Sequence, residues 1–287
     1  MAEAAELPGR TEATFRLPPL ACDTHCHVFG PQGRFPFSPG RKYDPTDSPK
    51  ETLAALHQRL GIERAVLVQA SAHGTDNSAL LDALAWHPEA WRGVALIDDE
   101  TSDRELALMH DAGVRGIRFN FVTSLGGYPD PSVFERAIAR ASELGWHVVL
   151  HLRGEDILAL GETIEALPLP FVIDHMGRLD PALALDQPPF RELLRLMELE
   201  GAWIKLSGAE RMCPHPYADA LPFARKLVSL RPDRILWGTD FPHPNLAADV
   251  DEHDLVQLVP AMAPEQAVQT LMLVENPARL YGFDAVP

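Results

Sequence analysis

The chain has 287 residues, of which 46% are hydrophobic, and it carries a formal net charge of −16 at pH 7. So much negative charge excludes sequence-independent binding to nucleic acid and adhesion to an anionic membrane, because both need clustered cations. The three cysteines form no Cys-x-x-Cys spacing, and the acidic start of the chain has no apolar signal segment. These features predict a globular, cytoplasmic protein.

Short β-branched segments alternate with longer amphipathic segments from one end of the chain to the other. Eight strands are predicted, at residues 20–27, 64–70, 93–97, 116–121, 147–152, 171–175, 203–207 and 235–240. The clearest helices that follow them are at 80–86, 105–112, 133–144, 190–198, 217–229 and 264–273. Strands that alternate with helices are typical of a parallel sheet, and eight such units predict an α/β fold of the (β/α)8 TIM-barrel type.

The barrel is expected to form a single domain over residues 16–287, preceded by a loose N-terminal arm at residues 1–15. The loop at residues 28–49 is long for a connection between a strand and a helix. It follows the first strand on the face where barrel active sites form, and it contains Phe29, Phe35, Phe37 and Tyr43. This position and this composition predict a lid over the site.

Polar side chains gather at the C-terminal ends of the predicted strands, where a barrel enzyme has its active site. They are His25, His27, Ser71, His73, Arg118, Asn120, His151, His175, Lys205, Ser207, Asp240 and His243. His25 and His27 are two residues apart, so in a strand they face the same side and can hold one ion or one polarised oxygen. The alternatives are a hydrogen-bonded pair of core histidines and, for Asp240, a helix cap or a salt-bridge partner.

Arginines near the predicted strand ends suit an anionic ligand. Arg118 is expected to point into the mouth of the barrel, where its planar guanidinium could bind a carboxylate; the alternative is a structural salt bridge. Arg178 and Arg211 follow strands six and seven and could add a second clamp or remain solvated. The chain has no Gly-x-Ser-x-Gly, Gly-x-Gly-x-x-Gly or Gly-Lys-Ser/Thr motif, which argues against a serine hydrolase, a dinucleotide enzyme and a P-loop NTPase.

Several longer motifs resemble the amidohydrolase superfamily, and within it the branch of the 2-pyrone-4,6-dicarboxylate hydrolases. They include Asp23-Thr-His-Cys-His-Val-Phe-Gly-Pro, Arg115-Gly-Ile-Arg-Phe-Asn-Phe, Ile173-Asp-His-Met-Gly-Arg, Trp237-Gly-Thr-Asp and Glu275-Asn-Pro-Ala-Arg-Leu-Tyr. The resemblance implies a lactonase in which Asp240 is the general base. It places His25, His27 and His175 around the lactone carbonyl. It also implies that the substrate is bound by Tyr43, Ser71, Arg118 and Arg211.

Two positions depart from the pattern of that branch. Ser124 stands where the branch has a second arginine that binds a carboxylate, so a second carboxylate would be held less tightly. His151 stands where the branch has a tyrosine that binds substrate, and it could itself donate a hydrogen bond to the substrate. The branch is similar to enzymes that work without a metal, so the resemblance requires no cofactor. However, His25, His27, His151 and Asp240 together offer three nitrogens and one oxygen, a set that suits one Zn²⁺ ion.

The motifs together predict a hydrolase that opens the lactone ring of a small, carboxylate-bearing compound resembling 2-pyrone-4,6-dicarboxylate, in the catabolism of aromatic compounds. The partner expected is therefore a small anionic lactone, with neither nucleic acid nor membrane. Ser124 favours relatives with another acidic group, such as 4-sulfomuconolactone, or a sugar-acid lactone. Two further alternatives keep the barrel: a related decarboxylase, and a protein that binds an acidic ligand without catalysis.

Overall fold

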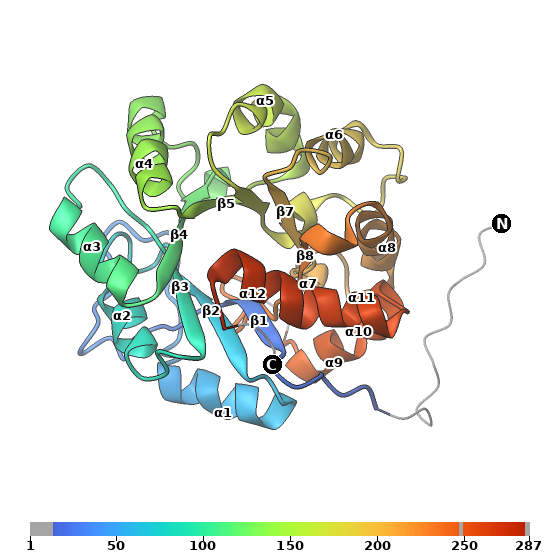
Figure 1. The fold of residues 1–287 in the computed structure, drawn as a ribbon, viewed down its shortest axis with the longest axis horizontal. Helices are drawn as coiled ribbons and strands as arrows, with labels where there is room; N and C mark the ends of the chain where they lie inside the picture. Colours follow the sequence, from blue (N-terminus) through green and yellow to red (C-terminus); the bar gives the residue numbers. More distant parts are fainter. Residues whose placement is uncertain (1–13, 247–248, 285–287) are drawn as a thin grey trace.

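The computed structural model describes residues 14–246 and 249–284, which form a barrel of eight parallel strands surrounded by helices (Figure 1). The strands are hydrogen-bonded in chain order, β1 to β8. They are β1 (Cys22–Cys26), β2 (Arg64–Val68), β3 (Trp91–Ala95), β4 (Val114–Asn120), β5 (His147–His151), β6 (Phe171–Ile173), β7 (Ala202–Lys205) and β8 (Ile235–Leu236). The predicted TIM barrel is thus confirmed. Most of the predicted N-terminal arm, residues 1–13, lies outside the described residues.

The segment after β8 closes the barrel against β1. The backbone N–H of Thr24 donates to the carbonyl of Trp237 at 2.9 Å, and the N–H of Asp240 donates to the carbonyl of His25 at 2.7 Å. A Cβ at position 238 would lie 2.6 Å from the backbone nitrogen of His25. Only glycine permits so close an approach of two backbones, which explains Gly238 in the Trp-Gly-Thr-Asp motif.

A bulge in β1 turns the two histidines toward the mouth of the barrel. Cys22 packs in the inner core of the barrel, whereas Cys26 packs in the outer core between strands and helices, although regular alternation would put both on one face. The register of β1 against β2 shifts between Asp23 and Cys26. The Asp23 carboxylate accepts a hydrogen bond from the backbone N–H of His25 at 3.0 Å. This extra residue in the strand lets His25 and His27 face inward.

Helices cover the outer face of the barrel. Those that follow the strands and those at the C-terminus are α1 (Lys50–Leu60), α2 (Ser78–Leu84), α3 (Asp103–Asp111), α4 (Pro131–Glu143), α5 (Gly154–Glu165), α6 (Pro188–Leu196), α7 (Ala209–Met212), α8 (Leu221–Leu230), α9 (Glu252–Gln257), α10 (Val259–Met262), α11 (Gln266–Thr270) and α12 (Asn276–Tyr281). The helix predicted at 217–229 begins later, at Leu221, and the one predicted at 264–273 is α11 followed by a π-helical turn. In the described part of the chain, no helix is long and apolar enough to cross a membrane.

All eight strands end earlier than predicted, and two of these ends, those of β6 and β8, lie at the site. β6 ends at Ile173 and β8 at Leu236, whereas the predictions extended to residues 175 and 240. His175 has φ 53° and Asp240 has φ 64°, so both residues adopt the left-handed conformation, which no regular strand contains. The chain therefore turns at these two residues and presents their side chains across the mouth of the barrel.

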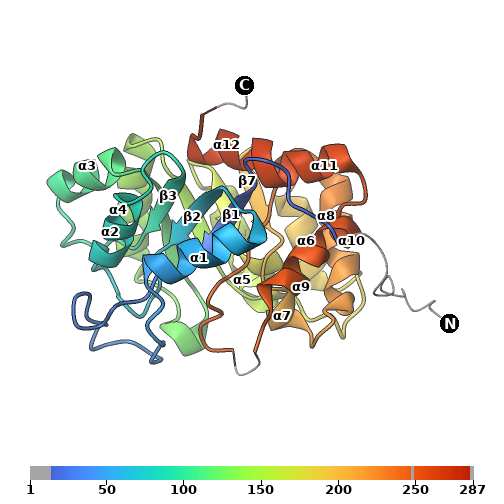
Figure 2. The same cartoon turned by 90° about the horizontal axis from the view of Figure 1, so that it is seen from below.

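The two ends of the barrel differ. Figure 2 shows the long loop after β1, in blue, at the opposite end of the molecule from α12. At the α12 end, Tyr281 and Phe283 pack with the inner core, and the guanidinium carbons of Arg64 and Arg92 lie 5.2 Å and 4.7 Å from the centre of the Phe283 ring. Aromatic side chains thus pack against the inner core at this end. In TIM barrels the active site lies at the other end, where the strands have their C-terminal ends.

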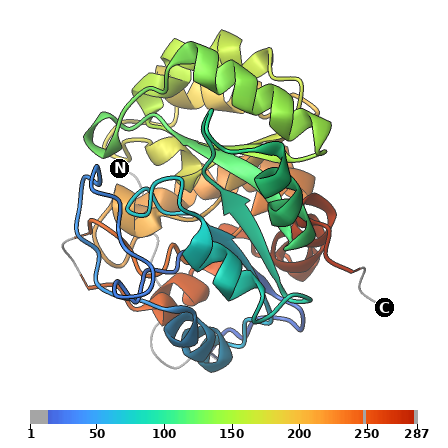
Figure 3. The ribbon, with the colours of Figure 1, turned by 90° about the vertical axis from the view of Figure 1, so that its left-hand side faces the viewer.

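The long loop at residues 28–49 has a small apolar core of its own and runs along one edge of the molecule (Figure 3). Phe29 and Phe37 pack with Ala70, which follows β2, and Tyr43 packs against this group. The ring of His73 accepts a hydrogen bond from the N–H of Gly30 at 3.4 Å and its other nitrogen lies 3.3 Å from the carbonyl of Pro36. The loop is therefore anchored beside the mouth, and its role as a lid stays a prediction.

Candidate active site

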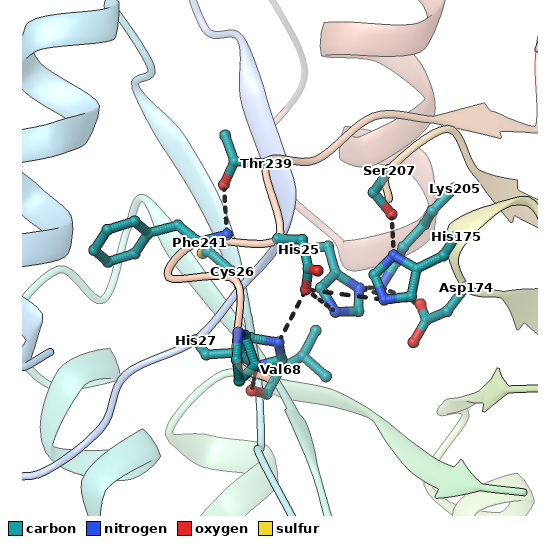
Figure 4. Close-up of polar contacts among 12 residues, drawn as sticks. His25, Cys26, His27, Val68, Asp174, His175, Lys205, Ser207, Thr239 and Phe241 are labelled. Carbon is teal, nitrogen blue, oxygen red and sulfur yellow. Dashed lines mark hydrogen bonds and ion pairs between the residues drawn. The ribbon is translucent and has the colours of Figure 1, made fainter. Parts of the chain in front are cut away.

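Three histidine rings converge on one aspartate at the mouth of the barrel. The Nε2 atoms of His25, His27 and His175 lie 3.5, 3.3 and 3.8 Å from Oδ1 of Asp240. All four side chains are buried. Figure 4 shows the three rings pointing toward one another from β1 and from the end of β6. The structure thus brings together all four residues that were predicted to be catalytic.

The far sides of the three rings are held by different partners. Nδ1 of His27 donates to the carbonyl of Val68 at 2.7 Å, and Nδ1 of His175 lies 2.9 Å from the hydroxyl of Ser207 (Figure 4). Nδ1 of His25 lies 3.1 Å from a carboxylate oxygen of Asp174. Because each Nδ1 is engaged, each ring directs Nε2 at Asp240.

The surroundings keep two of the rings neutral and the carboxylate ionised near neutral pH. Burial lowers the pKa of His25 to about 4, although the charge of Asp174 opposes the shift. Burial also lowers the pKa of His175 well below its usual value. Burial alone would raise the pKa of Asp240, but Arg211 and the neighbouring imidazoles outweigh it and hold that pKa well below its usual range. Asp240 is therefore ionised and able to accept a proton, and its Oδ1 lies beside two buried neutral imidazoles.

Arg211 binds the second oxygen of the same aspartate. Its Nε donates to Oδ2 of Asp240, and NH1 donates to the carbonyl of Pro244 at 3.1 Å. The short helix α7, which follows β7, carries this arginine. Arg211 was predicted to bind substrate; the structure places it on the candidate base, at the same mouth.

Asp174 forms a second charge cluster beside the first, and sequence reasoning did not single it out. Its Oδ2 accepts from Nε of Arg118 at 3.1 Å and also lies 3.1 Å from NH2 of that residue. Its Oδ1 lies 3.2 Å from Nζ of Lys205, which is fully buried. Burial raises the pKa of Asp174, while His25, Lys205 and Arg118 together lower it well below its usual range. The sequence could have indicated this residue, because Asp174 is an acidic residue at the end of a predicted strand and directly precedes His175.

The Asp174 cluster changes the reading of Arg118. The salt bridge that the sequence left open as an alternative is present, with two guanidinium nitrogens on the carboxylate. Tyr43 and Ser71 lie at the rim. Burial raises the pKa of the Tyr43 phenol, and a hydrogen bond with Ser71 and the charge of Arg118 oppose that shift. Ser124 is exposed, in a short 3-10 turn at Thr123–Leu125.

Arg178 is a cation at the mouth with no ion pair or hydrogen bond to any residue in 14–246 or 249–284. It directly follows the turn at His175, and its own φ is 43°. Its pKa is lowered to about 10 by burial and by the nearby charges of Arg211 and Arg153. A half-buried guanidinium among other guanidiniums is suited to receive an anion.

Three of the predicted metal ligands fit one another. One ligand atom each from His25, His27 and Asp240 lies within 4.8 Å of the others, and Nε2 of His25 is buried without a hydrogen-bond partner in the described chain. Zinc accepts such nitrogens and oxygens. The predicted fourth ligand, His151, belongs to no such group among the described residues. Its ring centre lies 5.3 Å from that of His175, and both its ring nitrogens are buried without partners.

Comparison with known proteins agrees with this arrangement. The amidohydrolase family model matches residues 22–283. The chain belongs to the amidohydrolase family. This amidohydrolase is 44% identical to 2-pyrone-4,6-dicarboxylate hydrolase of Comamonas testosteroni, over 95% of this chain and 93% of that protein. It is 40% identical to 4-sulfomuconolactone hydrolase of Hydrogenophaga intermedia, over 93% of this chain and 90% of that protein.

Solved structures agree on the architecture. An apo crystal structure from Agrobacterium tumefaciens superposes on this amidohydrolase with a TM-score of 0.85 and 29% identity, covering 94% of this chain and 98% of that one. The likeness extends over the barrel and its surrounding helices, so the family resemblance inferred from short motifs applies to the whole domain.

Proposed function

We propose that this amidohydrolase hydrolyses the ring ester of a small anionic lactone, with Asp240 as the general base. The proposal rests on one observation: the two carboxylate oxygens of Asp240 have different partners. One of its oxygens is held by Arg211, and the other faces three imidazole nitrogens at 3.3 to 3.8 Å. Two of the relatives are named as hydrolases of a 2-pyrone, which is a ring ester, and of a muconolactone, which supports this substrate class.

The proposed reaction begins with proton transfer from water to Asp240. The oxygen of that water bonds to the lactone carbonyl carbon, and negative charge develops on the carbonyl oxygen. His175 can accept from the Ser207 hydroxyl at Nδ1, which leaves its proton on Nε2 as a donor to that oxyanion. When the intermediate collapses, the ring C–O bond breaks and the ring oxygen receives the proton that Asp240 took from water, which restores the carboxylate. A carboxylate base and buried N–H donors are the groups that this chemistry needs.

We expect the acidic group of the substrate to bind at the mouth of the barrel beside its arginines. Arg178 has no ion-pair partner among the described residues, and it lies near the charges of Arg211 and Arg153. Arg118 has two nitrogens on Asp174, and so contributes charge more than direct contact. With exposed Ser124 in place of an arginine, this pattern supports a substrate with at least one strong acidic group and leaves the choice of the second group open.

A divalent metal held by His25, His27 and Asp240 would supply a bound water of lowered pKa. We propose that turnover does not need it, because Arg211 already provides positive charge at Asp240 and His151 lies outside the ligand group. The matching measurement is elemental analysis of gently purified protein, together with hydrolysis rates with and without a chelator. Chelator-insensitive turnover is expected. Loss of turnover with the chelator and its return with Zn²⁺ would contradict metal independence.

A panel of lactones tests the function itself. The panel contains 2-pyrone-4,6-dicarboxylate, 4-sulfomuconolactone and a sugar-acid lactone, with the folded Asp240→Asn variant as the reference. Ring opening by the natural chain and loss of it in the variant are expected. Release of carbon dioxide would instead indicate the decarboxylase, and protection against heat without turnover would indicate a barrel that only binds its ligand.

A further inference from the structure

A row of alternating charges leads away from Asp240 toward α9. Nε of Arg211, which binds Asp240, is 3.8 Å from Oε1 of Glu210. The same glutamate oxygen is 3.5 Å from Nδ1 of His243, and Nε2 of His243 is 3.5 Å from Oε1 of Glu252. The order is therefore carboxylate, guanidinium, carboxylate, imidazole, carboxylate. None of the three outer residues has a part in the proposed chemistry.

The outer members of this row are buried, which makes their charges depend on one another. The side chains of Glu210, His243 and Glu252 are 1%, 7% and 12% exposed. Neither carboxylate oxygen of Glu210 has a hydrogen-bond partner in the described part of the chain. A buried carboxylate without hydrogen bonds is costly unless cations lie beside it. For Glu210, those cations are Arg211 and His243.

His243 faces a carboxylate on each side of its ring. A neutral imidazole has one N–H and can donate to one of them, whereas an imidazolium donates to both. Each ring nitrogen lies 3.5 Å from a carboxylate oxygen, and two carboxylates so placed favour the imidazolium. The backbone supports the placement, because the N–H of His243 donates to the carbonyl of Asp240 at 2.7 Å.

We propose that His243 is a positioning residue that keeps Arg211 on Asp240 by neutralising Glu210, a carboxylate that competes for the same guanidinium. His243 balances the charge of Glu210, so Glu210 does not draw the guanidinium away from the base. Without the imidazolium, Arg211 would be the only cation next to a buried Glu210, and the two are already 3.8 Å apart. The geometric part of this inference stands alone, whereas its effect on turnover rests on the proposed lactone hydrolysis.

The test compares His243→Gln with His215→Gln as the matched control. His215 forms an exposed pair with Asp254 at 3.2 Å, with 63% of its side chain exposed, so the control removes a histidine–carboxylate contact near the same helix without touching the row. Two readouts are taken. One is the rate of hydrogen exchange of the Arg211 Nε–H, followed by NMR on protein with ¹⁵N-labelled arginine and assigned by its loss in Arg211→Lys. The other is kcat/KM on the lactone panel.

In His243→Gln we expect the Arg211 Nε–H to exchange at least about tenfold faster and kcat/KM to fall at least about tenfold, with neither changed in His215→Gln. The double variant Glu210→Gln/His243→Gln is expected to recover part of both losses, because the competing carboxylate is gone. A purely structural role would give additive losses without recovery. If His243→Gln does not fold, Glu252→Gln removes one carboxylate from the outer end, and a smaller change in the same two readouts is expected.

An unchanged Arg211 signal in His243→Gln, or in Glu252→Gln if that variant replaces it, overturns the positioning role. So does a double variant that is no better than His243→Gln. A natural chain that opens no lactone while His243→Gln still releases the Arg211 Nε–H contradicts the proposed function and leaves the positioning role supported.

Discussion

Two buried aspartates lie at the same end of the barrel and differ in the charges that surround them. Both oxygens of Asp174 are close to permanent cations, Lys205 on one side and Arg118 on the other. Only one oxygen of Asp240 meets such a cation, Arg211, and the other faces imidazoles. A neutral imidazole has one N–H donor and one free nitrogen, so it can pass on a proton without holding a permanent charge, whereas arginine and lysine act as cations beside a carboxylate. The partners of a buried carboxylate thus decide whether it stabilises the site or performs chemistry.

The largest effect expected from this comparison is on turnover. Asp240→Asn removes the base but keeps the shape of the side chain, so kcat for lactone hydrolysis should fall by about 10²- to 10⁴-fold. Steady-state kinetics on folded protein measure it, with Asp254→Asn, an acidic residue in an exposed pair with His215, as the control. A variant that retains natural kcat would remove Asp240 from the chemistry.

The corresponding change at the other aspartate should act on stability. Asp174→Asn leaves Lys205 and Arg118 buried without their carboxylate, and breaking a buried ion pair in this way costs about 3 to 5 kcal/mol. Urea unfolding should therefore show a lower free energy of unfolding for Asp174→Asn than for Asp240→Asn. Equal stabilities would show that the two clusters do not differ as described.

Lowering the pH should destabilise the protein because His25 favours protonation in the unfolded state, and this occurs at a higher pH than protonation of either aspartate. The pKa of His25 is about 4 in the folded chain and about 6.5 when unfolded, so the unfolded state binds the extra proton between these values. Stability from this residue is complete above pH 6.5 and declines as the pH falls toward 4, by about 3 kcal/mol in all.

His175 shifts in the same direction, while Asp174 and Asp240 have pKa values lowered well below their usual range and so remain ionised across most of this window. Unfolding free energies measured from about pH 7 to about pH 4 check the sign. Stability that stays constant or rises on acidification would contradict burial of neutral imidazoles. The His25→Gln variant should show a shallower decline than the natural chain.

The smallest effect is expected at the exposed turn Thr123–Leu125, which carries Ser124. Ser124→Arg adds a cation at an exposed position, where an ion pair contributes at most about 1 kcal/mol. KM for 2-pyrone-4,6-dicarboxylate should fall by up to about fivefold, with kcat unchanged. Ser124→Gln is the matched control, since it adds length without charge. A change in kcat would mean that this turn reaches the reacting carbonyl.

Most of the barrel and the candidate catalytic group could be predicted, because both depend on position along the chain. Alternating strands and helices define the eight units, and their strand ends bring His25, His27, His175 and Asp240 together. What could not be predicted depends on local geometry. The bulge in β1 breaks the alternation on which the prediction for the two histidines relied, yet it is what allows them to face the site.

The pairing of buried charges is the second feature that the sequence did not predict. Arg118 was predicted either to bind a substrate carboxylate or to form a structural salt bridge; the salt bridge is present, with Asp174 on two of its nitrogens, and substrate binding stays a prediction. His151 was predicted to bind substrate or, if a metal is bound, to be its fourth ligand; it lies in none of the candidate ligand groups of the described residues, and its role stays a prediction. Strand position alone does not show which of several buried side chains approach within hydrogen-bond distance, because that depends on side-chain directions around the barrel.

The most direct test of this account is the rate of ring opening by the purified protein with 2-pyrone-4,6-dicarboxylate and 4-sulfomuconolactone, measured beside Asp240→Asn. The account predicts hydrolysis of at least one of these lactones by the natural chain and its near-complete loss in the folded variant. No hydrolysis of either compound or of a sugar-acid lactone, or equal rates for the two proteins, would contradict it.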